Sequence, residues 1–291
     1  VNVGYGQQSI VQAAMEQMQR LPYATGYFSF GSEPAIQLAA RLVELSPASL
    51  QRVYFSLGGS DAIDAAIRYI THYYNTLGQP QRKHFIDEVI TGFGRTGPLF
   101  ACAEEGVEPD MMTVAKGLTS GYAPMGALLI SEEIYATIAD GPGGDRLVGH
   151  GQTYSAHPVS AAVGLEVLRL YLEGGLLAQG QAIAPYFQEH LQRMLQHPLV
   201  GDARSRGLLG ALELVADKRS RAPFDPALKL SERLSRIAYD NGIIFRAFGD
   251  NILGFAPALC FTESEFDFLF ERLTRSLDAL LEEADVIRAV A

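Results

Sequence analysis

The 291-residue sequence predicts an α/β fold up to about residue 165 and an α+β arrangement for the rest of the chain. Two observations carry this prediction. A β-prone run at residues 52–56 is followed by glycines and at once by an amphipathic helix, the order that opens an α/β unit. Within residues 202–255, strand-like runs instead surround a tight turn and lie next to long amphipathic helices.

The composition indicates a globular protein with a core. The chain is 48% apolar and 19% charged, which excludes a disordered protein, and its net charge of −10 argues against a nucleic-acid binder. Cys102 and Cys260 match no metal spacing, so we expect a reduced, cytoplasmic protein. No apolar run reaches the roughly 20 residues that a membrane helix needs, and the first residues do not resemble a signal peptide.

The periodicity of apolar residues predicts the individual elements. In the first half we expect helices at 7–20 and 32–45, a strand at 52–56, a helix from 60, strands at 84–86, 111–115 and 126–130, and a short helix from 131. In the second half we expect helices at 158–196 with a break at 174–175, strands within 202–215, a helix at 226–241, strands at 243–246 and 251–255, and a helix at 262–283. Ser32 and Thr262 are the N-cap candidates, the latter in a capping box with Glu265.

Lys116 is the first candidate for chemistry, because it directly follows an apolar strand. An ammonium group is costly to remove from water, so burial would lower the pKa of the lysine. The neutral amine could then attack an aldehyde. The alternative is a lysine whose charged end extends into solvent.

Asp87 is the second candidate, because two apolar residues precede it. A buried carboxylate needs a cationic partner, and a protonated pyridine nitrogen is one. Such a ring can take up the electron pair of a substrate carbanion. The alternative is an exposed aspartate at the end of a strand.

Two further features suit the binding of anions. Gly58-Gly59-Ser60 precedes a helix, whose free N–H groups and dipole would bind a phosphate, although glycine turns before helices are common. Arg246 lies in an apolar strand and suits a bidentate contact with a carboxylate, or a structural ion pair.

Two strings match known motifs by letter only. Residues 92–97 read GxGxxG, but Arg95-Thr96-Gly97-Pro98 is a poor helix start and Asp110 comes too early for a dinucleotide site. Residues 117–121 are not a GxSxG nucleophile turn, because the third residue is Thr119. The six histidines show no metal spacing, so we expect no metal.

Taken together, these residues resemble the class III (fold type I) aminotransferases, in particular the amine and ω-amino acid:pyruvate transaminases. The resemblance rests on DEVITGFGRTG at residues 87–97, Pro109-Asp110 and Ala115-Lys116-Gly117. It implies pyridoxal 5′-phosphate (PLP) as cofactor and a mostly parallel seven-stranded sheet flanked by helices. The large PLP-binding domain would comprise residues 24–165, and the smaller α+β domain residues 1–23 and 166–291.

The resemblance also implies roles for single residues. Lys116 would form the Schiff base with PLP and shuttle the proton, while Asp87 would pair with the pyridinium nitrogen. Val89 would pack on one face of the ring, and Gly59 and Ser60 would hold the phosphate.

Three more roles concern the substrate and the partner subunit. The segment HGQTYS at residues 150–155 resembles one whose threonine, here Thr153, reaches the phosphate of the neighbouring subunit, which implies a homodimer, or a tetramer, with shared sites. Arg246 resembles the mobile arginine that binds the substrate carboxylate. Tyr27 and Phe28 would lie near the substrate pocket.

One departure from the family concerns length. Its members run to about 420–460 residues, above the size of a single domain. Asp87 directly follows the strand His84-Phe85-Ile86, and His84 stands where the family has an apolar residue. Because parallel strands need a crossover of a dozen or more residues, we infer that about 130 residues are absent after Ile86.

The expected reaction moves an amino group from a primary amine or ω-amino acid to a keto acid such as pyruvate. Another reaction of the same fold, a decarboxylase, racemase or aminomutase, is the first alternative, because fold does not determine function. A truncated relative without catalysis is the second alternative, and only the absent segment favours it. The donor stays open among putrescine, β-alanine, γ-aminobutyrate, taurine and aryl-alkyl amines.

Overall fold

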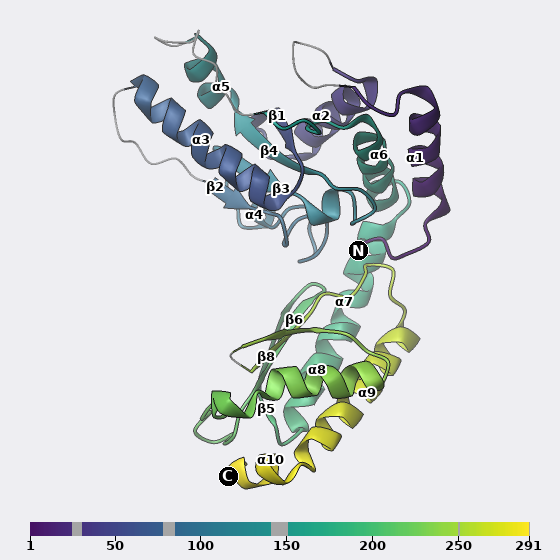
Figure 1. Cartoon of the computed structure of the whole chain (residues 1–291), viewed down its shortest axis with the longest axis vertical. Coiled ribbons are helices and arrows are strands. Elements are labelled where there is room, and N and C mark those ends of the chain that lie inside the picture. The colour runs from purple at the N-terminus through teal and green to yellow at the C-terminus, as the bar shows by residue number, and fades with distance from the viewer. Residues whose placement is uncertain (25–30, 78–84, 141–150, 250, 291) are drawn as a thin grey trace. The chain divides into compact units, whose positions relative to one another are not determined.

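The computed structural model describes residues 1–24, 31–77, 85–140, 151–249 and 251–290, shown as a ribbon in Figure 1. The chain forms two compact units. The first comprises residues Val1–Gly94 and Pro98–Leu177, and the second comprises Arg95–Gly97 and Ala178–Ala291. No helix in the described ranges has the length and apolar character needed to cross a membrane.

The first unit is built on a four-stranded sheet. Its strands are β1 (Leu50–Ser56), β2 (Phe85–Asp87), β3 (Met111–Val114) and β4 (Gly126–Ser131). In the order β1-β4-β3-β2, β2 runs parallel to β3, while β4 is antiparallel to both β1 and β3. All residues of β3 and β4 are buried, as expected for apolar strands that are covered on both faces.

Helices surround this sheet (Figure 1). They are α1 (Gln8–Arg20), α2 (Glu33–Leu45), α3 (Gly59–Leu77), α4 (Ala101–Glu104), α5 (Glu132–Asp140) and α6 (Pro158–Leu172), with a 3-10 turn at Lys116–Leu118. Ala66 and Tyr73 of α3 share a core with Met111 and Leu128 of the sheet. α2 packs against β1 and α6, and α1 packs against α6. The sheet is therefore enclosed by helices, and its strand ends are where functional side chains can emerge.

The second unit is built on an antiparallel sheet of order β5-β6-β8-β7. The strands are β5 (Val200–Arg206), β6 (Leu209–Leu214), β7 (Arg246–Phe248) and β8 (Ile252–Phe255). The helices are α7 (Leu176–Arg193), α8 (Leu230–Asp240), α9 (Glu263–Leu281) and α10 (Ala284–Ala289), with 3-10 turns at Met194–Gln196 and Pro226–Leu228. Phe187 of α7 packs against Phe266 and Phe270 of α9, which forms an aromatic core. The predicted capping box of Thr262 and Glu265 begins α9.

Residues Arg95–Gly97 belong to the second unit although they follow β2 in the chain. The Arg95 guanidinium is buried and donates hydrogen bonds to the carbonyls of Leu208 (3.1 Å) and Pro257. Gly207 fits this segment, because a Cβ there would collide with the backbone of Thr96. No helix opens at residues 92–97, which confirms that the GxGxxG string is not a dinucleotide motif.

The structure differs from the sequence predictions in three respects. The described part of the first unit has four strands rather than seven, because the chain between α3 and β2 is too short for additional strands. Residues 1–23 lie in the first unit instead of the second, where α1 packs on α6, and the boundary falls after Leu177 rather than at 165. The strand predicted at 243–246 is β7, which begins only at Arg246.

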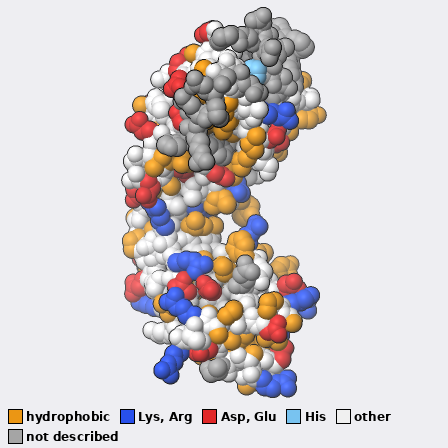
Figure 2. Space-filling model, turned by 90° about the vertical axis from the view of Figure 1, so that its left-hand side faces the viewer, with side chains coloured by type: hydrophobic (Ala, Val, Ile, Leu, Met, Phe, Trp, Pro, Cys, Tyr) orange, Lys and Arg blue, Asp and Glu red, His pale blue; other side chains and the backbone are white. Residues whose placement is uncertain are grey.

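The surface carries mixed charges. On the face drawn in Figure 2, the basic and acidic side chains of the described residues are interspersed. The net charge of −10 is therefore not gathered into one acidic patch on that face.

Candidate active site

Asp87 and Lys116 come from neighbouring parallel strands. Asp87 ends β2 and lies opposite Thr113 of β3 in the sheet register. Lys116 follows the end of β3 by two residues. Because parallel strands end at the same edge of a sheet, both side chains emerge at the carboxyl edge of the β2–β3 pair.

Asp87 is exposed and begins a tight turn. Its Oδ1 accepts a hydrogen bond from the N–H of Val89 (2.8 Å), and no salt bridge to its carboxylate is found among the described residues. The adjacent Glu88 is buried and accepts from the N–H of Cys102 (2.7 Å) and the hydroxyl of Thr91 (2.5 Å). Glu88 thus anchors the turn, while Asp87 keeps an oxygen free for a cation.

Cys102 is excluded as a reactive group. Burial, together with the hydrogen bond and the negative charge of Glu88, raises the pKa of the Cys102 thiol to about 12. A thiol with such a pKa holds its proton at neutral pH and is a poor nucleophile. Cys102 therefore has a structural role next to the turn that begins at Asp87.

The glycine turn before α3 lies against the same site. A Cβ built on Gly59 would lie 2.9 Å from Cγ1 of Val89 and 3.6 Å from Cβ of Ala115. Only glycine fits there without a shift, so the N-terminus of α3 approaches both the Asp87 turn and the residue before Lys116. Ser60 is exposed in the first turn of α3, where free N–H groups and the helix dipole favour an anion.

Lys116 is exposed although its neighbours Ala115, Gly117 and Leu118 are buried. No salt bridge to its amine is found among the described residues. Of the two alternatives for Lys116, burial or a side chain that extends into solvent, the structure shows the second, since the strand end places the side chain at the surface of the first unit. Its backbone has φ +25°, a conformation that costs free energy for a residue with a Cβ.

The segment that contains Thr153 is bound next to the N-terminus of α3. The amide of Gln152 donates to Oδ1 of Asp61 in the first turn of α3 (2.8 Å), and the hydroxyl of Tyr23 donates to the carbonyl of Thr153 (3.1 Å). Thr153 itself is exposed. Within the described ranges, Oγ of Ser155 is buried without a hydrogen-bond partner, as expected where a polar ligand completes a site.

Arg246 belongs to the second unit. It begins β7, and its guanidinium lies 5.1 Å from the centre of the Phe248 ring. Arg246 lines a cavity of about 510 Å³ whose other walls are mostly apolar, formed by residues that include Phe255, Pro257 and Phe261. Tyr27, Phe28 and His150 lie outside the described residues.

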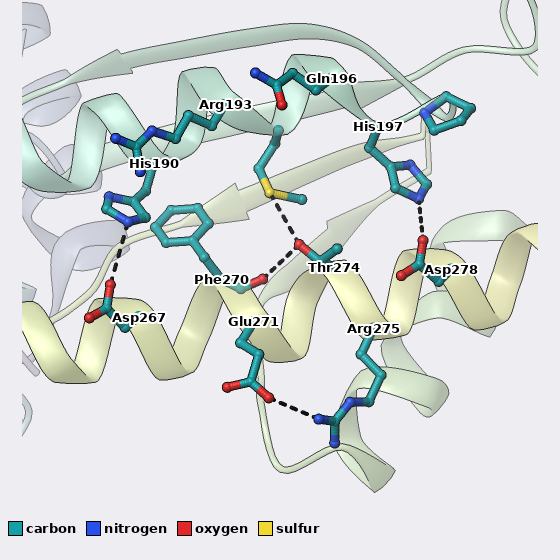
Figure 3. A pocket seen from close by; sticks show the side chains of 12 residues that line it. His190, Arg193, Gln196, His197, Asp267, Phe270, Glu271, Thr274, Arg275 and Asp278 are labelled. Carbon is teal, nitrogen blue, oxygen red and sulfur yellow. Dashed lines mark hydrogen bonds and ion pairs between the residues drawn. The ribbon is translucent and has the colours of Figure 1, made fainter.

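A larger groove in the second unit contains none of the predicted site residues. It has a volume of about 900 Å³ and lies between α9 and the end of α7 with the turn that follows (Figure 3). His190 faces Asp267 at 3.4 Å, and His197 faces Asp278 at 3.3 Å. Because Nδ1 of His197 accepts from the N–H of Leu199, Nε2 of the neutral ring is the donor to Asp278.

Sequence reasoning missed several residues that build the site. Glu88 stands next to Asp87 but was given no role, although a charged residue directly after a buried strand is a signal in itself. Gln152 and Tyr23, which hold the Thr153 segment, carry no local signal. Tyr171 is a fully buried tyrosine in the apolar helix α6, and such a hydroxyl needs a hydrogen-bond partner.

Comparison with known proteins identifies the family. The family model for class III aminotransferases matches residues 85–277, more than half of the chain. The chain belongs to the class III aminotransferase family. It is therefore a PLP-dependent enzyme of fold type I that transfers an amino group from an amine or amino acid to a keto acid.

Individual relatives of this aminotransferase support the assignment. The putrescine–pyruvate aminotransferase of Pseudomonas aeruginosa is 30% identical over 391 residues, with 96% of this chain and 84% of the relative covered. The adenosylmethionine-8-amino-7-oxononanoate aminotransferase of Geobacter sulfurreducens is 36% identical over 191 residues, with coverage of 66% and 42%. The (S)-enantioselective ω-transaminase from Thermomicrobium roseum superposes with a TM-score of 0.91 at 29% identity, with coverage of 97% and 86%.

The residues at the β2–β3 edge of this aminotransferase fit PLP. Lys116 and Asp87 are exposed and bound in no salt bridge among the described residues, so an amine and a carboxylate are available to the cofactor. Gly59 leaves room that a Cβ would fill, beside Val89 and the N-terminus of α3. This set provides a nucleophile, an anion for a ring nitrogen, an apolar contact and a phosphate site.

Proposed function

We propose that this aminotransferase moves an amino group from a primary amine or ω-amino acid to a keto acid such as pyruvate, with Lys116 and Asp87 as the central residues. The observation that carries the proposal is the convergence of Asp87, Val89, Gly59 and Lys116 at one sheet edge. When bound, PLP supplies a ring that accepts the electron pair released at the substrate carbon.

Lys116 acts twice in this proposal. Its amine would hold the cofactor through the aldehyde, and the same amine, when free, would move a proton at the substrate carbon. An exposed lysine at the end of a rigid strand can reach both positions, since its side chain has four rotatable bonds. The amine must be neutral for either step, because only the neutral amine has a free electron pair.

Asp87 holds the ring nitrogen protonated in this proposal. Its Oδ1 is engaged by the N–H of Val89, so the turn orients the carboxylate and would leave Oδ2 for the ring nitrogen. An opposite charge within about 4–6 Å raises the pKa of a pyridine nitrogen and favours its charged form. Val89, which lies beside Gly59, would pack on the ring, and the N–H groups at Gly59 and Ser60 would bind the phosphate.

The second unit would provide the carboxylate site. Arg246 is the charged residue of a mostly apolar cavity, which suits a substrate with a carboxylate and an apolar part. The named relatives act on different donors, so the donor is a matter for experiment. Tyr27 and Phe28 remain proposed pocket residues.

We also propose a cytoplasmic homodimer in which Thr153 reaches the phosphate of the partner subunit. The Thr153 segment supports this, because Gln152 binds Asp61 next to the phosphate site and leaves Thr153 exposed. Analytical ultracentrifugation together with mixing of Thr153→Ala and Lys116→Ala chains would test it. Shared sites predict that a mixed dimer has one site with both defects and one with neither.

We propose that the absent segment falls directly after Ile86, within the residues that form β2. The alignment with the putrescine–pyruvate aminotransferase spans 391 positions, at least 100 more than the 291 residues of this chain. The family match begins at residue 85, the first residue of β2. An intact-mass measurement tests the proposal: a mass near 31.6 kDa means that the segment is truly missing from the protein.

The decisive experiment is reductive labelling. The purified chain is incubated with PLP, reduced with borohydride and digested, and the modified peptide is mapped by mass spectrometry. A label on Lys116 supports the proposal, and incubation with candidate amines and pyruvate then identifies the donor through alanine formation. A label confined to other lysines would contradict it.

A further inference from the structure

We propose that Tyr171, together with residues 2–7 of the N-terminal segment, positions Lys116 by holding the turn that carries it. Tyr171 is a positioning residue here, because it acts through the backbone of Gly117. The inference rests on the proposed role of Lys116 and adds to it the means by which the lysine is held in place.

The turn at Lys116 has a backbone that needs external support. Lys116 has φ +25°, Ser120 has φ +53°, and Gly121 has φ +80°. The two residues with side chains lie in a region that costs free energy and persists only where surrounding contacts enforce it. The direction in which the Lys116 side chain leaves the backbone therefore depends on contacts outside the turn.

Tyr171 makes one of these contacts from α6. Its hydroxyl is buried and donates a hydrogen bond to the carbonyl of Gly117 (2.8 Å), the residue after Lys116. Its ring stacks on Phe93, with ring centres 6.0 Å apart. Gly117 is enclosed on this side, since a Cβ there would lie 2.7 Å from Cδ2 of Phe93.

The N-terminal segment binds the other side of the turn. The N–H of Val3 donates to Oγ of Ser120 (3.0 Å), and the amide of Asn2 donates to the carbonyl of Phe93 (3.1 Å). The hydroxyl of Tyr122 donates to the carbonyl of Gly4 (2.9 Å) and accepts from the N–H of Gln7 (2.9 Å).

These bonds join parts of the chain that lie 54 to 118 residues apart. The turn thus has no freedom to relax to negative φ unless a partner is removed. Loss of the Tyr171 hydroxyl removes one donor to the Gly117 carbonyl. The donor that remains is the N–H of Ser120, at 3.3 Å. The strained backbone would then relax, and the Lys116 amine would leave the place at which it meets the cofactor.

Tyr171→Phe tests this inference against Tyr73→Phe as the matched control. Tyr73 lies in the same unit, is buried, and donates a hydrogen bond of the same 2.8 Å length to Glu133. Hydrogen exchange of the chain without cofactor is measured first. We expect the amides of residues 117–122 to exchange about tenfold faster in Tyr171→Phe and unchanged in Tyr73→Phe.

The second readout follows the bond between Lys116 and PLP. The visible absorbance of PLP bound to Lys116 changes with pH. We expect the midpoint of this change to shift by about half a pH unit or more in Tyr171→Phe, because the Lys116 amine is held differently. Retention of PLP during dialysis should fall about threefold or more. Equal values for Tyr171→Phe, Tyr73→Phe and the parent chain would overturn the inference.

Ser120→Ala is the second variant, and it tests whether the turn at Lys116 is held by these contacts if Tyr171→Phe does not fold. It removes the acceptor of the Val3 N–H, so the same amides should exchange faster. Unchanged exchange in Ser120→Ala would then overturn the inference. A parent chain that takes no label on Lys116 refutes the proposed function instead, and the exchange experiment still reports whether the turn is held.

Discussion

Two regions of the molecule differ in whether their charged side chains have ion-pair partners. The groove between α7 and α9 has a volume of about 900 Å³, and its charged side chains are paired, as His190 with Asp267 and His197 with Asp278 (Figure 3). The β2–β3 edge has Asp87 and Lys116, for which the described residues provide no ion pair. The acidic and basic side chains that line the larger cavity therefore already have partners among the described residues.

We infer from this difference that polar groups without an ion-pair partner indicate an active site better than cavity volume does. Ion pairs at a surface contribute little to the stability of the fold. A free amine and a free carboxylate held by rigid strand ends can act on a ligand at little reorganisation cost. The following variants compare the two regions, from the largest expected effect to the smallest.

Lys116→Ala is expected to have the largest effect. It removes both the attachment of the cofactor and the proton carrier, so kcat should fall by about 10³-fold or more. Alanine formation from pyruvate with an active donor measures it. Lys218→Ala is the control from the groove region, where Lys218 donates to the carbonyl of His197 (3.1 Å), and it should keep near-parental activity.

Asp87→Asn removes the negative charge and keeps the shape. Without an anion the ring nitrogen loses its proton, so turnover should fall by about 10²-fold, a smaller loss than for Lys116→Ala. Asp278→Asn is the matched control, because it removes the negative charge of the carboxylate that faces His197 in the groove. Its turnover should equal that of the parent chain. If both variants lose activity equally, the contrast between the regions does not hold.

Gly59→Ala should weaken PLP binding and stability together. The added methyl group would lie 2.9 Å from Val89, which must move, at a cost of about 1–3 kcal/mol in the free energy of unfolding. Gly58→Ala meets only Oδ2 of Asp61 at 3.9 Å, so its stability loss should be smaller. Thermal unfolding and PLP titration of both variants measure the difference.

Replacement of His197 should have the smallest effect, and this effect should concern only the pH dependence of the stability of the fold. Burial lowers the pKa of His197 against the opposing effect of Asp278, so the unfolded chain binds a proton more readily than the folded one. Stability from this residue is present above its unfolded pKa of about 6.5 and is lost as the pH falls below it. Unfolding midpoints between pH 5 and 8 should drop less steeply towards acid in His197→Gln.

Most of the elements could be predicted from local patterns. The helices α1, α3 and α9 follow the 3.6-residue period of apolar positions, and the capping box at Thr262 marks where α9 begins. β7 was predicted too early, because Ile243 and Ile244 are β-prone but lie before the pairing with β8. A strand exists only where it has a partner, and that partner lies elsewhere in the sequence.

The sequence by itself determined which residues we propose for the chemistry. Lys116, Asp87 and Gly59 were predicted from residue type and from their places after strands and before a helix, and these are local properties. Family membership follows from the same residues and is shown by the match over residues 85–277.

Only the tertiary structure decided how those residues are presented. It shows Lys116 exposed rather than buried, Gly59 against Val89, and residues 2–7 on the turn after Lys116 within the first unit. The hydrogen bond from Tyr171 to Gly117 joins residues 54 positions apart. Local patterns report propensity and periodicity, whereas such contacts form only when distant segments pack, because packing buries enough apolar surface to offset the entropy of ordering them.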